Sequence, residues 1–171
     1  PLIRDLKSLG ATGGAAAVRS VRTHIPNPVR LRIEAGHQDF VNETRVCTCM
    51  FVGFTRMAQT TADPSGGVAA VASATASTLE RCVRVLQDQV QKHGGTLLQV
   101  RCDEKGYLAI CAWGLPGRTH KDNCHRAISA AVGLTQELRG AEGSPPGCVA
   151  GVTTGKLLCA VVRGAQRAEY T

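Results

Sequence analysis

A charged turn between two short apolar runs is the first place in this sequence where the residue types could support chemistry. The turn reads Asp103-Glu104-Lys105-Gly106. Carboxylate oxygens are the ligands that a hard divalent cation prefers, whereas a fixed ammonium group beside them repels such an ion. Two interpretations are therefore open: an acidic metal-binding cluster, or a plain reversal of the chain for which Gly106 supplies backbone freedom.

The apolar runs on either side of this turn predict an antiparallel hairpin. In the first run, Leu97, Gln99 and Arg101 alternate with apolar residues, at the two-residue period of a strand. This alternation places Gln99 and Arg101 together on one polar face. In the second run, 107–113, both faces are apolar, so we expect the hairpin to lie at the centre of a sheet.

Two amphipathic helices are predicted to cover this sheet, over 68–92 and 122–139. Gly94 and Gly95 are expected to end the first helix. On the second helix the expected apolar stripe is Cys124, Ile128, Ala131, Thr135 and Leu138.

Two further strand regions complete the pattern. Residues 45–54 alternate as a strand, and 148–162 predict a second hairpin that turns near Thr154 and Gly155. The order strand, helix, strand, strand, helix, strand, strand predicts an α/β sandwich of ferredoxin-like plan. Its antiparallel sheet would carry helices on one face and leave the other partly open, so we expect a partner domain there.

Composition limits the class of protein. The chain has 171 residues, 43% of them hydrophobic and 19% charged, with a net charge of +7. This length suits one domain plus an additional segment, and we assign residues 1–42 to a linker arm. The diffuse positive charge suits a phosphate-bearing ligand, nucleic acid, an acidic partner or simple solvation. No apolar run approaches the roughly 20 residues of a transmembrane segment.

The cysteines indicate the compartment. None of the eight forms a CxxC pair, and the close ligand pairs typical of zinc sites are therefore missing. We interpret them as reduced thiols packed inside apolar strands and helices, which favours a cytoplasmic location.

Three segments resemble the class III nucleotide cyclases, and among them the second cyclase domain of soluble, bicarbonate-responsive adenylyl cyclase. They are ETRVCTCMFVGFT (43–55), GGTLLQVRCDEKGYLAICAWGLPG (94–117) and GVTTGKLLCAVVRGAQRAEYT (151–171). The resemblance covers residues 43–171, which we assign to one cyclase domain that is incomplete at its C-terminus. In this family two cyclase domains pair head to tail, and the active site lies between their open sheet faces.

The resemblance implies that this half holds no catalytic metal. The family's two metal-binding aspartates fall on Met50 and Lys105 here, and neither a thioether nor an ammonium group suits magnesium. The expected Mg²⁺ would therefore be held by the partner domain. Gln99 falls on the family's base-contacting lysine, Arg101 shares its face and could substitute, and Thr171 falls on a second base contact. We expect these three residues to bind substrate and none of them to be catalytic.

The activity implied is that of an adenylate cyclase, a phosphorus–oxygen lyase that converts ATP to cyclic AMP and pyrophosphate in intracellular signalling. The chain ends before the asparagine and arginine that the family uses in the transition state, so this fragment alone is expected to be inactive. The main alternative is a catalytically inactive pseudo-cyclase domain with a regulatory or dimerisation role. A ferredoxin-like nucleic-acid binder is a weaker alternative, because no RNA-binding consensus is present, and we expect no nucleic acid partner.

Overall fold

The structure, a computed structural model, describes residues 42–55, 68–104, 106–139, 147–163 and 168–170, with Ile25, Arg30, Glu34 and Gly36. The chain divides into two compact units. The first comprises Pro1–Arg45, Leu115–Gly117 and Leu157–Thr171, and the second comprises Val46–Gly114 and Arg118–Lys156. Most of the predicted arm, 1–42, lies outside the described residues, so the boundary at residue 42 stays a prediction.

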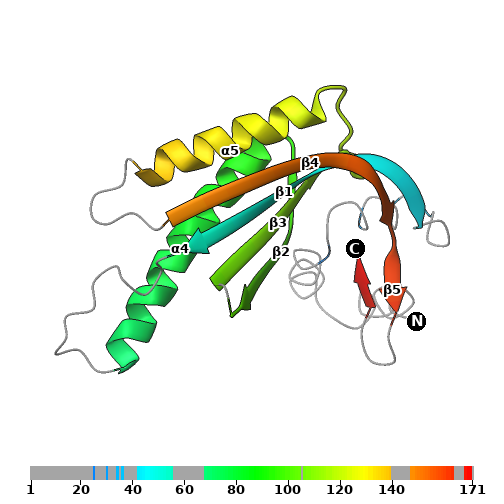
Figure 1. Ribbon diagram of the computed structural model, residues 1–171. Helices are drawn as coiled ribbons and strands as arrows, with labels where there is room; N and C mark the ends of the chain where they lie inside the picture. The colour runs from blue at the N-terminus through cyan, green and yellow to red at the C-terminus, as the bar shows by residue number, and fades with distance from the viewer. Residues whose placement is uncertain are drawn as a thin grey trace. The chain divides into compact units, whose positions relative to one another are not determined.

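The elements follow the predicted order closely (Figure 1). They are β1 (Glu43–Thr55), α4 (Val68–Lys92), β2 (Thr96–Asp103), β3 (Gly106–Trp113), α5 (Asn123–Arg139), β4 (Gly147–Cys159), β5 (Val161–Arg163) and β6 (Ala168–Tyr170). Strands β2, β3, β1 and β4 form a four-stranded sheet in that order, and β5 pairs with β6 in a separate two-stranded sheet. This strand order and the antiparallel β1–β3 and β2–β3 pairs confirm the ferredoxin-like plan.

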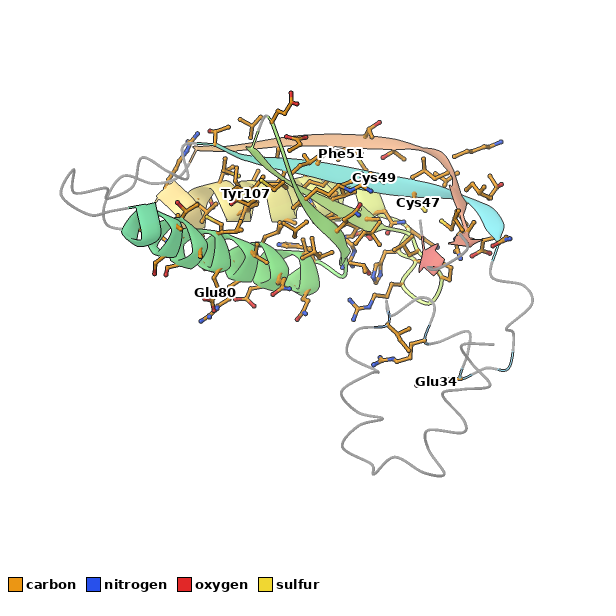
Figure 2. The ribbon with its side chains drawn as sticks, turned by 90° about the horizontal axis from the view of Figure 1, so that it is seen from below. Glu34, Cys47, Cys49, Phe51, Glu80 and Tyr107 are labelled. Carbon is orange, nitrogen blue, oxygen red and sulfur yellow. The ribbon has the colours of Figure 1, made fainter. Side chains whose placement is uncertain are left out.

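Both helices lie on one side of the four-stranded sheet (Figure 2). The core fills the space between them and the sheet, with Met50, Val52 and Phe54 of β1 paired against Cys111, Ala109 and Tyr107 of β3. Leu86 and Val90 of α4 pack against this layer. Burial of a large aliphatic side chain is worth about 1.5–3 kcal/mol, so this layer is what attaches the helices to the sheet.

The end of α4 is set by backbone hydrogen bonds. Gly95 N–H donates to the carbonyl of Val90 at 2.8 Å, and Gly94 N–H donates to that of Gln91 at 3.0 Å. This pair of bonds is a Schellman motif. The motif needs a residue in the left-handed conformation directly after the C-cap of the helix, which is the position of Gly94. Gly94 has a φ of +74°, so the predicted stop at these glycines is confirmed.

The hairpin is confirmed, with one correction to its place. Gly106 turns the chain with a φ of +117°, and Asp103 pairs with Gly106. Strand β3 lies inside the sheet, as expected, but β2 is an edge strand rather than a central one.

The predicted buried stripe of α5 is wrong at its N-terminal half. Cys124 and Ile128 are exposed, and the buried residues are Ala127, Ala130, Leu134 and Leu138. Ala127, Ala130, Leu134 and Leu138 recur at intervals of three and four residues, so they form one buried stripe of the helix, and Cys124 and Ile128 lie outside it. The helix itself starts and ends within one residue of its predicted bounds.

The second predicted hairpin is also wrong, because β4 continues through Thr154 and Gly155 as one strand. The hydroxyl oxygens of Thr154 and Thr48 lie 2.9 Å apart and form a hydrogen bond between β4 and β1. This contact between distant parts of the chain keeps the segment extended where turn-forming residues predicted a reversal.

All eight cysteines are free thiols, but their burial differs from the prediction at two positions. Cys102 and Cys124 are exposed, whereas five others are buried and Cys148 is half-buried. Cys102 lies on the edge strand and Cys124 on the outward face of α5, which explains their access to solvent. Among the described residues, no helix is long and apolar enough to cross a membrane.

Candidate functional site

The sheet face opposite the helices is the candidate site. Phe51 of β1 is 42% exposed and pairs with the half-buried Ile110 of β3, and Gly53 pairs with Leu108. On β4, Cys148, Ala150 and Val152 pack against the core, so the intervening Val149 points to the opposite face, where it is 68% exposed. The second unit therefore presents an apolar sheet surface that its own helices do not cover.

A β-bulge in β2 decides which of its residues reach this face. Leu97 pairs with Cys111 on the helix side, and the register then shifts so that Gln99 pairs with Ile110 on the open side. The extra residue, Leu98, lies between them. Leu97 thus packs against the core, which corrects its predicted place beside Gln99 and Arg101.

Gln99 and Arg101 lie together on the open face, as predicted. Gln99 pairs with Ile110 and Arg101 pairs with Leu108, two residues away on β3, so both pairs lie on the same face. Gln99 is half-buried and Arg101 is exposed. The two polar side chains therefore border the apolar surface of Leu108 and Ile110, and a planar ligand on that surface would meet both an amide and a guanidinium group.

The described residues do not fit a magnesium site. Met50 is 0% exposed and belongs to the helix-side core, so its side chain is withdrawn from the open face. No group of three or more His, Cys, Asp or Glu residues that could hold a metal occurs in the described part of the chain. Asp103 and Glu104 are exposed at the end of the hairpin, and Lys105 lies outside the described residues.

Thr171 also lies outside the described residues, so its assignment to substrate binding stays a prediction. The structure thus brings together two of the three predicted substrate-binding residues, Gln99 and Arg101. Their roles in binding remain predictions as well.

Sequence reasoning missed a second feature, a shallow groove of about 530 Å³ between α4 and α5. Its lining comes from Gln89, Lys92, His93, Ser129, Val132, Gly133, Gln136 and Glu137. Charged residues on a helix are usually a solvated face, so spacing alone gives no signal for a groove. Only the close approach of the two helices makes one.

Similar solved structures are nucleotide cyclases. A bacterial light-regulated adenylyl cyclase matches with a TM-score of 0.71 and 16% identity, over 99% of this chain and 48% of that chain. The catalytic core of a rhodopsin-guanylyl cyclase with converted specificity, in complex with ATPαS, has a TM-score of 0.56 and 14% identity, over 77% of this chain and 67% of its own. The adenylyl cyclase CyaB from P. aeruginosa has a TM-score of 0.54 and 15% identity, over 76% and 66%.

The fold of this chain is therefore the fold of the class III adenylyl and guanylyl cyclase catalytic domains. No protein-family model matches the sequence, and no curated protein matches it. The chain spans about half the length of the light-regulated cyclase, 48%.

Proposed function

We propose that this chain is one half of a paired nucleotide cyclase, the half that contacts the purine and holds no catalytic metal. The paired enzyme converts ATP to cyclic AMP and pyrophosphate at the interface with a second cyclase domain, in the same chain or in a homologous subunit. One observation carries the proposal: on a cyclase fold, Gln99 and Arg101 lie side by side on the sheet face that the helices leave uncovered.

The chemistry of this pair suits a purine edge. A glutamine amide offers one acceptor and two donor hydrogens, so it can match an amino group beside a ring nitrogen. An arginine guanidinium is planar and only donates, so it suits a ring nitrogen acceptor or a phosphate oxygen. Leu108 and Ile110 between the pair and β1 provide an apolar surface for the flat base.

The uncovered face supports pairing with a second domain. Contiguous apolar surface on a soluble protein marks an interaction site, and Phe51 and Val149 are both exposed there. A similar structure, the dimeric guanylyl cyclase domain of a RhoGC fusion protein from the aquatic fungus Blastocladiella emersonii, matches with a TM-score of 0.55 and 14% identity. Because the described residues of this chain do not fit magnesium, we place any Mg²⁺ on the partner domain.

Reconstitution tests this proposal. The purified chain is mixed with a separate cyclase domain that carries both metal-binding aspartates, and cyclic AMP and cyclic GMP are measured with ATP or GTP and Mg²⁺. We expect no turnover by the chain alone and turnover by the pair above that of the partner alone. Gln99→Ala should lower kcat/KM of the pair about tenfold or more, the effect of losing one hydrogen bond to bound substrate. Gln91→Ala, an equivalent change on the exposed side of α4, should leave it unchanged.

The pseudo-cyclase alternative is favoured by one specific observation, the complete burial of Met50 among apolar side chains. A position that has become part of the core supports packing rather than metal binding. In that case the mixture forms a stable complex without any increase in turnover, and Gln99→Ala has no effect. Turnover by the isolated chain would contradict both interpretations.

A further inference from the structure

Two hydrogen bonds hold the short link between α4 and β2, at the corner where α5 begins. The indole of Trp113 donates to the carbonyl of His93 at 3.0 Å, and Arg118 Nη1 donates to the carbonyl of Gly95 at 3.0 Å. Strand β2 starts at Thr96, the next residue. The position of His93 therefore affects both the end of α4 and the start of β2.

Positively charged side chains gather at this corner. We define the basic corner as Lys92, His93, Arg118, His120, His125 and Arg126. A Cβ atom added at Gly94 would lie 2.8 Å from His120 Nε2 and 3.7 Å from Arg126 Nη1, so both side chains lie against the end of α4. His93 itself is half-buried. A proton gained by His93 therefore adds positive charge where positive charge is already concentrated.

The nearby carboxylates have other partners. Asp122 Oδ1 lies 2.8 Å from Arg126 Nε. Glu137 lines the same groove as His93, and it accepts a hydrogen bond of 2.8 Å from Gln89. The carbonyls near the end of α4 attract a cation as well, but three of them already accept a backbone N–H group. No ion pair involves His93 within the described part of the chain, so its neutral form fits this corner better than its charged form.

The pKa of His93 is lowered from its ordinary value of 6.5, first by burial and then by the positive charges of Lys92, Arg126 and His125. The folded chain therefore binds this proton less readily than the unfolded chain does. The resulting stability is complete above about pH 6.5 and is lost as the pH falls from there toward the lowered pKa of the folded chain. The repulsion is local, because the groups that oppose the proton lie at the end of α4 and the start of α5.

We propose that the basic corner is an acid-sensitive contact, in which protonation of His93 separates the end of α4 from the start of α5. A proton from water adds to the imidazole and no other covalent bond forms or breaks. Separation relieves the repulsion between the two helix ends and gives the charged ring access to water. The hydrogen bonds from Trp113 and Arg118 weaken at the same time, so the start of β2 loosens. The proposal does not depend on the cyclase proposal, because it uses neither Gln99 nor Arg101.

Nuclear magnetic resonance of the unaltered chain tests this inference directly. The imidazole resonances of His93 and the indole N–H resonance of Trp113, the one tryptophan of the sequence, are followed from about pH 8 to about pH 5. We expect His93 to titrate below pH 6.5, and the indole resonance to move with the same midpoint. A midpoint at or above pH 6.5, or an indole resonance that does not follow it, would overturn the proposal.

Hydrogen exchange then shows whether the corner opens. The amides of Gly94 and Gly95 are protected by bonds to carbonyls of α4, and their exchange rates are divided by the intrinsic rate at each pH. We expect the corrected rates to rise about threefold or more as His93 gains its proton, because several like charges each weaken the contact. Amides inside β1 are the reference and should keep their rates. An equal rise in β1 would mean that the whole fold opens, which contradicts a local contact.

Three glutamine variants assign the response to one histidine. His93→Gln keeps a polar side chain that gains no proton, so the pH dependence of Gly95 exchange should disappear. His125→Gln is the matched control: it removes an exposed histidine of the same corner, and it should keep the response while raising the midpoint of His93 slightly. Thermal unfolding at about pH 7.5 verifies that each variant is folded. An unchanged response in His93→Gln would contradict the proposal, as would a response lost only in His120→Gln.

Discussion

The indole Nε1 of Trp113 donates a hydrogen bond of 3.0 Å to the backbone carbonyl of His93. This bond joins the last residue of β3 to the residue that follows α4. Trp113 is fully buried, so its indole N–H depends on an acceptor from the protein, and the His93 carbonyl is that acceptor. The pair therefore fixes the end of α4 against the sheet.

Replacing this tryptophan should destabilise the protein strongly. Trp113→Phe leaves the His93 carbonyl without its donor and leaves a void beside the smaller ring. We expect a loss of about 2–4 kcal/mol in the free energy of unfolding, measured by urea denaturation followed by circular dichroism. The control, Ile128→Ala on the exposed face of α5, should cost less than about 1 kcal/mol. Equal losses in the two variants would contradict the role of the hydrogen bond.

The backbone at Gly95 should tolerate no side chain. A Cβ atom there would overlap the indole ring of Trp113, which is rigid and buried. We expect Gly95→Ala to lower the free energy of unfolding by about 1–3 kcal/mol, the usual range for overpacking a core. The measurement is the midpoint of thermal unfolding, which should fall. Gly151→Ala is the matched control, because nothing lies within 4 Å of its added Cβ. A Gly95→Ala variant as stable as Gly151→Ala would show that the ring can move.

Gly133 sets two effects against each other. Alanine in a helix interior is favoured over glycine by about 1 kcal/mol, but a Cβ atom at Gly133 would overlap the side-chain oxygen of Gln89. Gln89 must then move and lose its hydrogen bond to Glu137, which is 2.8 Å long. We expect Gly133→Ala to be neutral or destabilising in the natural sequence. In a Gln89→Ala background the same change should stabilise, and a double-mutant cycle measures the difference. Equal effects in the two backgrounds would rule out this conflict.

Alkaline pH should destabilise the fold through buried thiols. The ordinary pKa of a cysteine thiol is 9.0. Burial, with a smaller contribution from the nearby Cys49, raises the pKa of Cys111 to about 12. Burial and the nearby Cys82 raise the pKa of Cys148 to about 11, although Arg139 acts in the opposite direction. The folded chain therefore holds these protons more tightly than the unfolded chain. The resulting stability is complete below pH 9 and is lost as pH rises from about 9 toward 11 and 12, by up to about 1.4 kcal/mol per pH unit for each thiol.

Variants separate this effect from the titration of lysines and tyrosines. Cys111→Ala should flatten the decline of the unfolding free energy above pH 9, measured by urea titrations at each pH. Cys102→Ala removes an exposed thiol and should leave the slope as it is. A slope that is the same in all three proteins would contradict the assignment.

The elements were predictable where the apolar pattern is long. Helix α4 has the predicted bounds, and β1, β2, β3 and α5 are close to theirs. The two helices bury one face and expose the other, so their apolar periodicity follows the fold directly, whereas β3 was recognisable as a short run that is apolar on both faces. The buried side of α5 was not predictable from side-chain size, because the N-terminal half of the helix buries the small Ala127 and Ala130 and leaves the larger Ile128 exposed.

The candidate site was predictable in part. Alternation placed Gln99 and Arg101 correctly on one face, but it also placed Leu97 there. The bulge that separates Leu97 from Gln99 depends on pairing with β3, and nothing in the local sequence marks it. The continuous strand through Thr154 likewise depends on a partner far along the chain, Thr48. The groove between α4 and α5 required the packing of both helices and had no sequence signal.

The bulge also determines how β2 tolerates changes in length. Leu98 is one residue more than β3 requires, so its deletion would restore a regular strand with Leu97 still on the core side and Gln99 still opposite Ile110. Deletion at Val100 would instead invert every later residue of the strand, because side chains alternate with a period of two. Natural insertions and deletions in this hairpin should therefore concentrate at position 98. There the chain can lose a residue while every other residue of β2 keeps its place on the core side or on the open face of the sheet.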